Sequence, residues 1–302
     1  MIYVFSNRNI VNNNWLGDDF NALGNENIRV AKVHLNSNGK PKLKFYDEKE
    51  NESLPSVKVI EEVEASSKPC CLFLHGFNQN LEKNLNKCKE IEEYGVNVIA
   101  FSWPSNPGPK GIFWKIKEYR NAQQNARRST VALERFFDKF SDYYQSTGAL
   151  HNIKSLVIHS LGNYLMQSFV TSLGYSQQNS YLNNILLHQA DVNSEEHEKW
   201  ADKLADNCRV LATINESDDV LDFSDFINPD RLGNTLENLR SDIIKYFNFG
   251  RIPESDDEHR LWIPPTTNND NAQKFFDSIF KGKKVKTGHL EFDQVRNCFH
   301  ME

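Results

Sequence analysis

The stretch Leu156-Val157-Ile158-His159-Ser160-Leu161-Gly162-Asn163 decides the fold. Three apolar residues, typical of a buried strand, lead into a single serine, and Gly162 opens a stretch with helical spacing that extends to residue 173. A sharp turn between such a strand and helix lifts the serine oxygen above the end of a sheet. The positive end of the helix dipole lies beneath that oxygen and favours negative charge that develops there. The pattern predicts that Ser160 is a nucleophile.

Ile158 departs from the usual form of this motif, G-x-S-x-G, in which a glycine stands two residues before the serine. A bulky side chain at that position crowds the turn. Taken alone, the stretch also fits a serine that only caps a helix after a strand. The choice between these two interpretations depends on signals elsewhere in the chain.

Short apolar runs alternate with long amphipathic stretches from residue 69 onward. This alternation predicts the α/β class, with a mostly parallel central sheet and helices on both of its faces. The expected strands are Cys70–Leu74, Val96–Phe101, Ser155–Ile158, Ile185–His188 and Val210–Ile214. The expected helices between and after them lie near residues 81–93, 119–144, 162–173 and 195–205.

The two ends of the chain are expected to join the same domain, residues 1–302. Residues 1–65 are polar and rich in asparagine, and they are expected to supply antiparallel edge strands at Ile2–Phe5 and Ile28–Leu35. Residues 104–118 and 222–270 contain several prolines and are expected to be lid or loop excursions. Further elements are expected as helices near residues 236–246, 272–280 and 291–299, with a short strand at 284–286.

Composition excludes several classes of partner. The 302 residues are 39% hydrophobic and carry a net charge of −6 with no basic stripe, so nucleic-acid binding is not expected. No apolar run approaches the roughly 20 residues of a membrane span. The five cysteines form no C-x-x-C pair, which indicates free thiols and a cytoplasmic location. Nucleotide-binding glycine loops, H-E-x-x-H and zinc-type cysteine clusters are also missing, so neither a cofactor nor a metal is expected.

A second chemical signal lies upstream, where the apolar run Leu72-Phe73-Leu74 ends in His75-Gly76-Phe77. Backbone that follows a buried strand reaches the C-terminal edge of the sheet, where its amides can face a substrate oxygen. Stabilising an oxyanion requires two such donors. We expect them to be the backbone amides of Phe77 and Leu161.

The general base is expected at His289, in Thr287-Gly288-His289-Leu290. After this kind of nucleophile the partners follow in the order acid, then histidine, and the histidine belongs in a loop after the last strand. His289 has that position and a flanking glycine. Of the other histidines, His259 is interpreted as a surface residue, His300 as part of a frayed end, and His159 as a residue whose backbone matters more than its ring.

The acid is expected after the strand at 210–214, where Asp218 and Asp219 both qualify by position. A triad acid must accept a hydrogen bond from the imidazole and stabilise the imidazolium that forms. Asp191, after the preceding strand, is a third candidate, although a turn residue before the next helix is the simpler interpretation.

An apolar wall for the substrate is expected from Trp103, Phe113 and Trp114, which flank a segment containing Pro104, Pro107 and Pro109. A proline-rich loop with aromatic side chains at a sheet edge suits a substrate wall or a lid. The alternative is a structural loop whose aromatic side chains pack back onto the core.

Together these motifs resemble a poorly characterised branch of the α/β-hydrolases. The shared motifs are Asn7-Arg8, His75-Gly76-Phe77-Asn78, Phe101-Ser102-Trp103-Pro104-Ser105, His159-Ser160-Leu161-Gly162-Asn163, Ala190-Asp191-Val192, Asp218-x-Val220-Leu221-x-x-Ser224 and Arg231-Leu232-Gly233. The resemblance implies an α/β-hydrolase fold over nearly the whole chain and the acid role for Asp218 rather than Asp219. It also implies that the elbow closes without its first glycine. It implies no particular substrate.

A serine, an acid and a histidine in this order predict hydrolysis of a carboxylic ester, or of a thioester or lipid ester, through an acyl-enzyme. The expected partner is a small-molecule or lipid ester. A phospholipase-like effector directed at membranes would use the same residues, but the net negative charge disfavours adsorption to anionic lipid. The alternative from another class is a hydrolase-like binding protein without activity. The complete serine, acid and histidine set argues against it, because a protein without activity would not need to keep these residues.

Overall fold

The structure is a computed structural model that describes residues 1–48, 52–105, 112–148, 150–173, 175–176, 180–205, 207–225, 228–252 and 259–302. The strands are β1 (Ile2–Ser6), β2 (Arg8–Val11), β3 (Trp15–Phe20), β4 (Arg29–Leu35), β5 (Pro41–Phe45), β6 (Cys70–Leu74), β7 (Asn97–Ser102), β8 (Ile153–His159), β9 (Asn184–His188), β10 (Arg209–Ile214), β11 (Lys245–Asn248), β12 (Glu291–Asp293) and β13 (Cys298–His300). The α-helices are α1 (Pro55–Glu64), α2 (Leu81–Glu92), α3 (Ile112–Arg128), α4 (Thr130–Thr147), α5 (Gly162–Val170), α6 (Glu198–Ala201), α7 (Asp219–Asp225) and α8 (Asp270–Phe280). Short 3₁₀ helices lie at Asn12–Asn14, Asp202–Leu204 and Thr266–Asn268.

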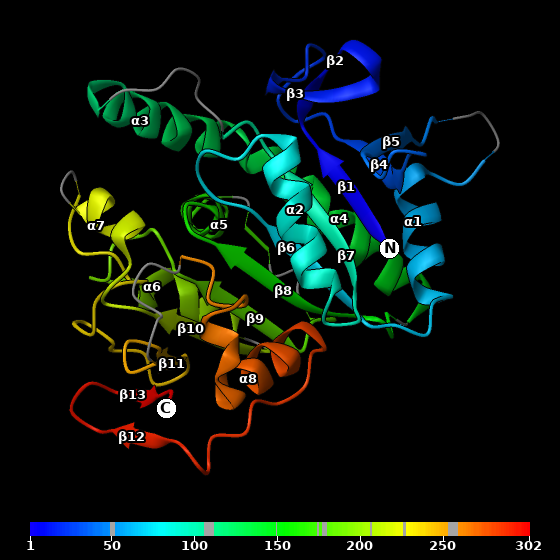
Figure 1. Cartoon of the computed structure of the whole chain (residues 1–302). Helices are drawn as coiled ribbons and strands as arrows, with labels where there is room; N and C mark the ends of the chain where they lie inside the picture. Colours follow the sequence, from blue (N-terminus) through cyan, green and yellow to red (C-terminus); the bar gives the residue numbers. More distant parts are fainter. Residues whose placement is uncertain are drawn as a thin grey trace.

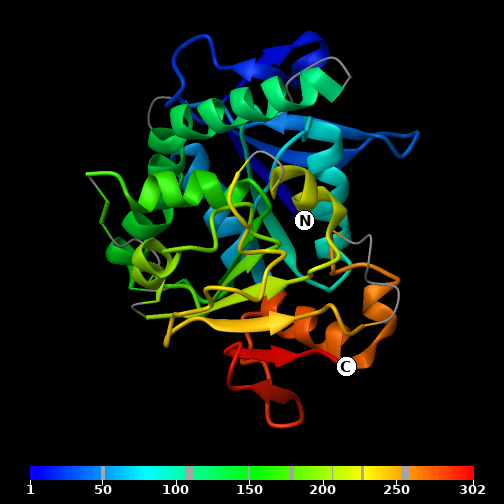
Figure 2. The ribbon, with the colours of Figure 1, turned by 90° about the vertical axis from the view of Figure 1, so that its left-hand side faces the viewer.

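An eleven-stranded sheet organises the chain, in the order β12-β13-β11-β10-β9-β8-β6-β7-β1-β4-β5. Every neighbouring pair from β13 to β1 is parallel, and the antiparallel pairs lie at the two edges. The sheet twists from the blue N-terminal strands to the red C-terminal hairpin (Figures 1 and 2). This architecture confirms the predicted mostly parallel α/β sheet.

Alternate side chains of each strand divide the core between the two faces of the sheet. In β6, Cys70, Leu72 and Leu74 belong to the cluster that contains apolar side chains of α1, α3, α4 and α5. Cys71 and Phe73, between them in the chain, belong to the cluster with α2 and α8. A strand covered on both faces must be apolar throughout, because successive side chains point to opposite sides. This is why the core strands read as continuous apolar runs.

The N-terminal segment contributes both interior and edge strands. The predicted antiparallel strand at Ile28–Leu35 is present as β4, and β5, which was not predicted, lies beyond it at the edge. The prediction of an edge strand is wrong for Ile2–Phe5, because β1 lies inside the sheet and runs parallel to β7. β2 and β3 form a separate antiparallel pair. None of the helices in the described part of the chain is long and apolar enough to cross a membrane.

The C-terminal third departs most from the expected elements. Residues 245–248 form β11 rather than the end of a helix, and they pair with Leu211–Ile214 of β10. Residues 291–300 form the hairpin β12–β13 in place of a closing helix, because Asn297 adopts a left-handed φ of 54° and the Asp293 side chain accepts hydrogen bonds from the amides of Val295 and Arg296. Residues 284–286 form no strand.

Candidate active site

Ser160 occupies a strained turn between β8 and α5. Its φ is +54°, in the left-handed region that residues with a side chain rarely adopt. The strand end of β6 approaches this turn so closely that a Cβ on Gly76 would lie 2.6 Å from the Ser160 Cβ. A Cβ on Gly162 would lie 2.8 Å from the carbonyl oxygen of His75. The elbow therefore needs glycine at 76 and 162, while Ile158 is buried in the core.

The backbone around Ser160 is held from three directions, and its hydroxyl is left available. The Ser160 amide donates to the His188 carbonyl at 2.9 Å, and the Asn163 side chain donates to the Ser160 carbonyl at 3.0 Å. The Asp191 amide also donates to that carbonyl. Ser160 is 4% exposed, and its Oγ makes no hydrogen bond within the described part of the chain. The backbone is therefore fixed, while the hydroxyl has no structural partner and is free to react.

Asp218 lies at the end of the turn after β10 and is fully buried. Its Oδ2 accepts hydrogen bonds from His259 Nδ1 at 2.6 Å and Gln189 Nε2 at 2.8 Å. Its Oδ1 accepts from the amides of Val220 at 3.0 Å and Leu221 at 3.1 Å. Four donors thus satisfy one carboxylate and fix its orientation.

The charge state of Asp218 follows from these contacts. Burial alone would raise the pKa of this carboxyl, but His259 and the hydrogen bonds from His259, Gln189 and Leu221 outweigh it and hold the pKa below the ordinary value. Because an ionised carboxylate only accepts hydrogen bonds, Nδ1 of His259 must carry the proton. In a neutral imidazole with its proton on Nδ1, Nε2 is the nitrogen that can accept a proton, as a general base must.

The structure places His259, and not His289, against the Asp218 carboxylate. The ring of His289 is exposed, and its Nε2 contacts Asn271 Oδ1 at 3.1 Å. His289 lines a separate cavity of about 570 Å³ beside α8, together with Lys274 and Leu290. The proximity of His259 to Asp218 was overlooked because residues 245–248 were interpreted as helix. β11 lies beside β10, and His259, which follows β11 in the chain, contacts Asp218.

The other two acids have different surroundings. Asp219 is exposed in the first turn of α7. Asp191 is buried, and its carboxylate accepts hydrogen bonds from Tyr119 at 2.9 Å and from Ser224 at 2.7 Å, with Arg231 at 3.6 Å. No histidine in the described ranges donates to Asp191. These contacts favour Asp218 as the acid partner of the histidine.

The turn Gly76–Gln79, here called the oxyanion turn, carries the amide of Phe77. Neither this amide nor that of Leu161 has a hydrogen-bond partner among the residues that the structure describes. Gly76 packs directly against Ser160, so the turn and the elbow adjoin each other. Two unengaged amides on adjoining turns are what an oxyanion hole needs.

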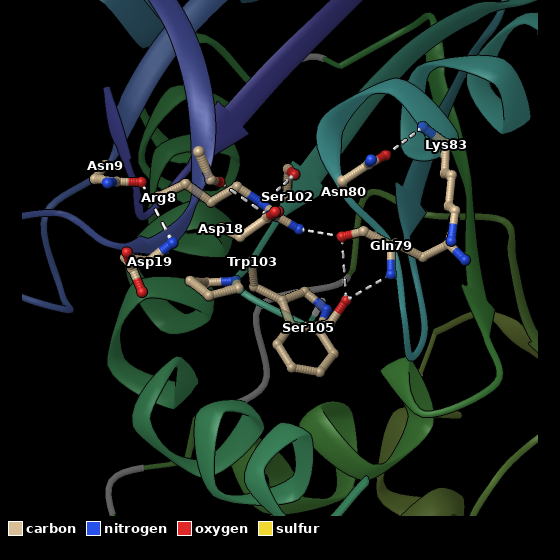
Figure 3. A network of polar contacts seen from close by, with 12 residues as sticks. Arg8, Asn9, Asp18, Asp19, Gln79, Asn80, Lys83, Ser102, Trp103 and Ser105 are labelled. Carbon is tan, nitrogen blue, oxygen red and sulfur yellow. Dashed lines mark hydrogen bonds and ion pairs between the residues drawn. The ribbon is translucent and has the colours of Figure 1, made fainter. Parts of the chain in front are cut away.

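Arg8 ties the oxyanion turn to the N-terminal strands (Figure 3). Its buried guanidinium donates to Ser102 Oγ at 3.0 Å, to Asp18 Oδ1 at 2.9 Å and to the Gln79 carbonyl at 2.5 Å. Burial lowers the pKa of Arg8 to about 10, which leaves it charged at neutral pH. Ser105 adds a second support, because its Oγ donates to the Gly76 carbonyl at 2.8 Å. Arg8, Ser102 and Ser105 thus link the first strands and the end of β7 to this turn.

The predicted substrate wall is not supported at Trp103. This indole is fully buried, donates from Nε1 to the His75 carbonyl at 2.9 Å and stacks on the His75 ring with 5.5 Å between centroids. It therefore belongs to the support of the oxyanion turn and offers no surface to a substrate. The side chains of Phe113 and Trp114 lie outside the part of the chain that the structure describes.

Comparison with known protein families agrees with this fold. Residues 53–248, more than half of the chain, match the family model described as "Alpha/beta hydrolase of unknown function (DUF900)". The chain belongs to this family. Ser160, Asp218 and the oxyanion turn of this α/β hydrolase lie within the matched segment, whereas His259 follows it. No curated protein matches the chain significantly.

Proposed function

We propose that this α/β hydrolase cleaves a carboxylic ester, with Ser160 as nucleophile, His259 as general base and Asp218 as the acid that orients the base. The hydrogen bond between His259 Nδ1 and the buried Asp218 carboxylate carries the proposal. His259 also lies against the elbow, since its ring is 4.7 Å from the ring of His159, the residue before Ser160.

The proposed reaction has two halves. Ser160 Oγ attacks the carbonyl carbon while Nε2 of His259 takes the hydroxyl proton. The amides of Phe77 and Leu161 hold the negative oxygen, and collapse of the tetrahedral intermediate expels the alkoxide, which receives the proton from His259. Water then attacks the acyl group, gives a proton to His259 and releases the carboxylic acid. As the acyl–serine bond breaks, His259 returns its proton to Ser160 Oγ and the free enzyme is restored.

The surroundings of Asp218 support this cycle energetically. An imidazolium that forms beside a fully buried carboxylate is stabilised more strongly than it would be in water, because the local dielectric constant is low. The four donors to Asp218 keep that carboxylate in place throughout the cycle.

Thioesters and lipid esters fall in the same substrate class because they need no additional catalytic group. We also infer a cytoplasmic location, which the five free cysteines support.

Covalent labelling tests the proposal. A fluorophosphonate probe should label the wild-type protein at Ser160, and Ser160→Ala should abolish labelling without loss of fold. Ser155→Ala is the matched control, because Ser155 is a buried serine of β8 whose Oγ donates to the Phe280 carbonyl at 2.9 Å. Labelling at a different serine would reject Ser160 as the nucleophile. No labelling in buffer or in detergent would favour an inactive binding protein.

A further inference from the structure

The segment His259–Trp262, here called the base segment, is anchored at each of its residues. A general base must lie within hydrogen-bond reach of the proton that it removes. The backbone that carries His259 therefore needs fixed coordinates as much as its ring does. The contacts of this segment come from β8, β9 and α2, so three elements outside the triad determine where the base lies.

His159 holds the first residue of the base segment. Its Nε2 lies 3.0 Å from the carbonyl oxygen of His259, and its Nδ1 is buried without a hydrogen-bond partner in the described structure. Because a carbonyl only accepts, Nε2 carries the proton and Nδ1 is bare. Burial, reinforced by His259, Lys87 and His188, holds the pKa of His159 well below its ordinary value. The ring is thus a neutral donor.

His188 holds Leu261, the third residue of the base segment, and here the ring accepts the hydrogen bond instead of donating it. The Leu261 amide donates to His188 Nε2 at 3.3 Å, so that nitrogen is the bare one. His188 Nδ1 then donates to Thr213 Oγ1 at 2.9 Å. The same Thr213 oxygen accepts the amide of Gln189, whose side chain donates to Asp218. The support of the base and the support of the acid are therefore continuous.

Helix α2 holds the two remaining residues. Glu90 forms an ion pair with Arg260 and accepts a hydrogen bond from Trp262 Nε1 at 3.0 Å. Tyr94, just beyond α2, donates to the Trp262 carbonyl at 2.6 Å. The buried indole of Trp262 packs against the rings of His159 at 5.3 Å and His188 at 4.7 Å.

We propose that His159, His188 and Glu90 are positioning residues that fix the base segment and thereby set the catalytic rate. The inference rests on the proposed function, since it assigns these residues to the base of that reaction. None of the three is placed to contact the reacting atoms: each acts through the backbone or side chains of residues 259–262. The histidine before the nucleophile thus acts through its ring, contrary to the expectation that its backbone matters more.

The test compares two replacements of His159. His159→Phe keeps an aromatic ring but has no donor, whereas His159→Gln places an amide N–H near the position of Nε2. A misplacement of about 1 Å can cost on the order of 100-fold in rate. We expect kcat for a p-nitrophenyl ester to fall roughly 10- to 100-fold in His159→Phe with KM unchanged, and to recover in His159→Gln. The downfield ¹H NMR resonance of the Nδ1 proton between His259 and Asp218 should broaden in the first variant only.

His197→Phe is the matched control for a buried histidine. His197 Nδ1 lies 2.6 Å from the Ser194 carbonyl, a contact of the same kind that does not involve the base segment. We expect it to lower the melting temperature without changing kcat or the NMR resonance. If His159→Phe behaves like this control, its role is purely structural and the proposal is overturned.

Glu90→Gln provides a second test of the proposal, which applies even if His159→Phe fails to fold. Glu90 is partly exposed, and the amide loses the charge that pairs with Arg260. We expect a smaller fall in kcat than in His159→Phe, while Glu92→Gln on the same helix leaves kcat unchanged, because Glu92 pairs with the N-terminus. Unchanged kcat in Glu90→Gln would reject the proposal. A wild-type protein that resists the fluorophosphonate probe would instead reject the proposed function.

Discussion

Replacing Asp218 by Asn is the sharpest test of the acid, because the structure shows which half of the side chain matters. Oδ1 of the new side chain can still accept the amides of Val220 and Leu221, as Asp218 Oδ1 does. The other half becomes an NH₂ group, which faces Nδ1 of His259 and Nε2 of Gln189. Two donors cannot bond to each other, so each partner must rearrange to present an acceptor.

The expected rearrangements separate activity from stability. His259 can shift its proton to Nε2 and accept the introduced amide N–H at Nδ1, but Nε2 can then no longer take the Ser160 proton. We expect kcat to fall on the order of 10⁴-fold, as for the equivalent change in a serine protease, which corresponds to about 5.5 kcal/mol of transition-state stabilisation. Gln189 can turn its amide so that Oε1, which is buried without a partner among the described residues, accepts the new N–H. We therefore expect the free energy of unfolding to fall by only about 1–3 kcal/mol.

The assay is steady-state hydrolysis of a p-nitrophenyl ester, with thermal unfolding measured on the same samples. Asp219→Asn and Asp191→Asn are the comparison variants. Asp219 is exposed, and Asp191 is bonded to Tyr119 and Ser224 rather than to a histidine. Both should retain far more activity than Asp218→Asn. The reasoning is refuted if Asp191→Asn is the crippling change, or if Asp218→Asn stays within about tenfold of wild type.

Four further predictions concern the base, the elbow, the oxyanion turn and acid stability. His289→Ala should leave kcat unchanged, since Asn271 is the only hydrogen-bond partner of this exposed ring among the described residues; a loss comparable to that of His259→Ala would restore it as the base. Gly76→Ala should lower activity about 100-fold or more and destabilise the fold by about 1–3 kcal/mol, because its Cβ would meet the elbow, whereas Gly288→Ala, with nothing within 4 Å, should be silent in both assays. Arg8→Lys should lower kcat more than it changes KM and cost roughly 1–3 kcal/mol in urea unfolding, since one ammonium group cannot replace the branched contacts; unchanged stability in urea would contradict this. Because the pKa of Asp218 is lowered by folding, its stabilisation is present above the ordinary pKa of about 3.9 and is lost as the pH falls through the lower value, so wild type and Asp218→Asn should converge in urea stability in acid.

Local patterns in the sequence predicted most of the fold. A parallel strand covered on both faces must be apolar along its whole length, so β6, β7, β8, β9 and β10 were visible as short apolar runs. β11 was hidden because its four residues continue a segment that also fits helical spacing, and only pairing with β10 selects the extended form. The hairpin β12–β13 was missed for the same reason, since Asn297 in the left-handed region is a feature of the turn that the sequence alone does not reveal.

The positions of Ser160 and Asp218 close to the ends of two strands were also predicted from sequence, because each strand is a short apolar run. Ser160 follows β8 directly, and Asp218 lies four residues after β10 ends at Ile214. The resemblance to known motifs then chose Asp218 over Asp219.

Only the tertiary structure decided which histidine meets Asp218. His259 is 41 residues from this acid, and the contact exists because β11 pairs with β10 and because β8, β9 and α2 anchor the base segment. His289 had the better local sequence but lies on another surface beside α8. A strand or a turn is encoded by residues that are adjacent in the chain. A hydrogen bond between loops depends on the order of the strands that carry them, and that order is a property of the whole sheet.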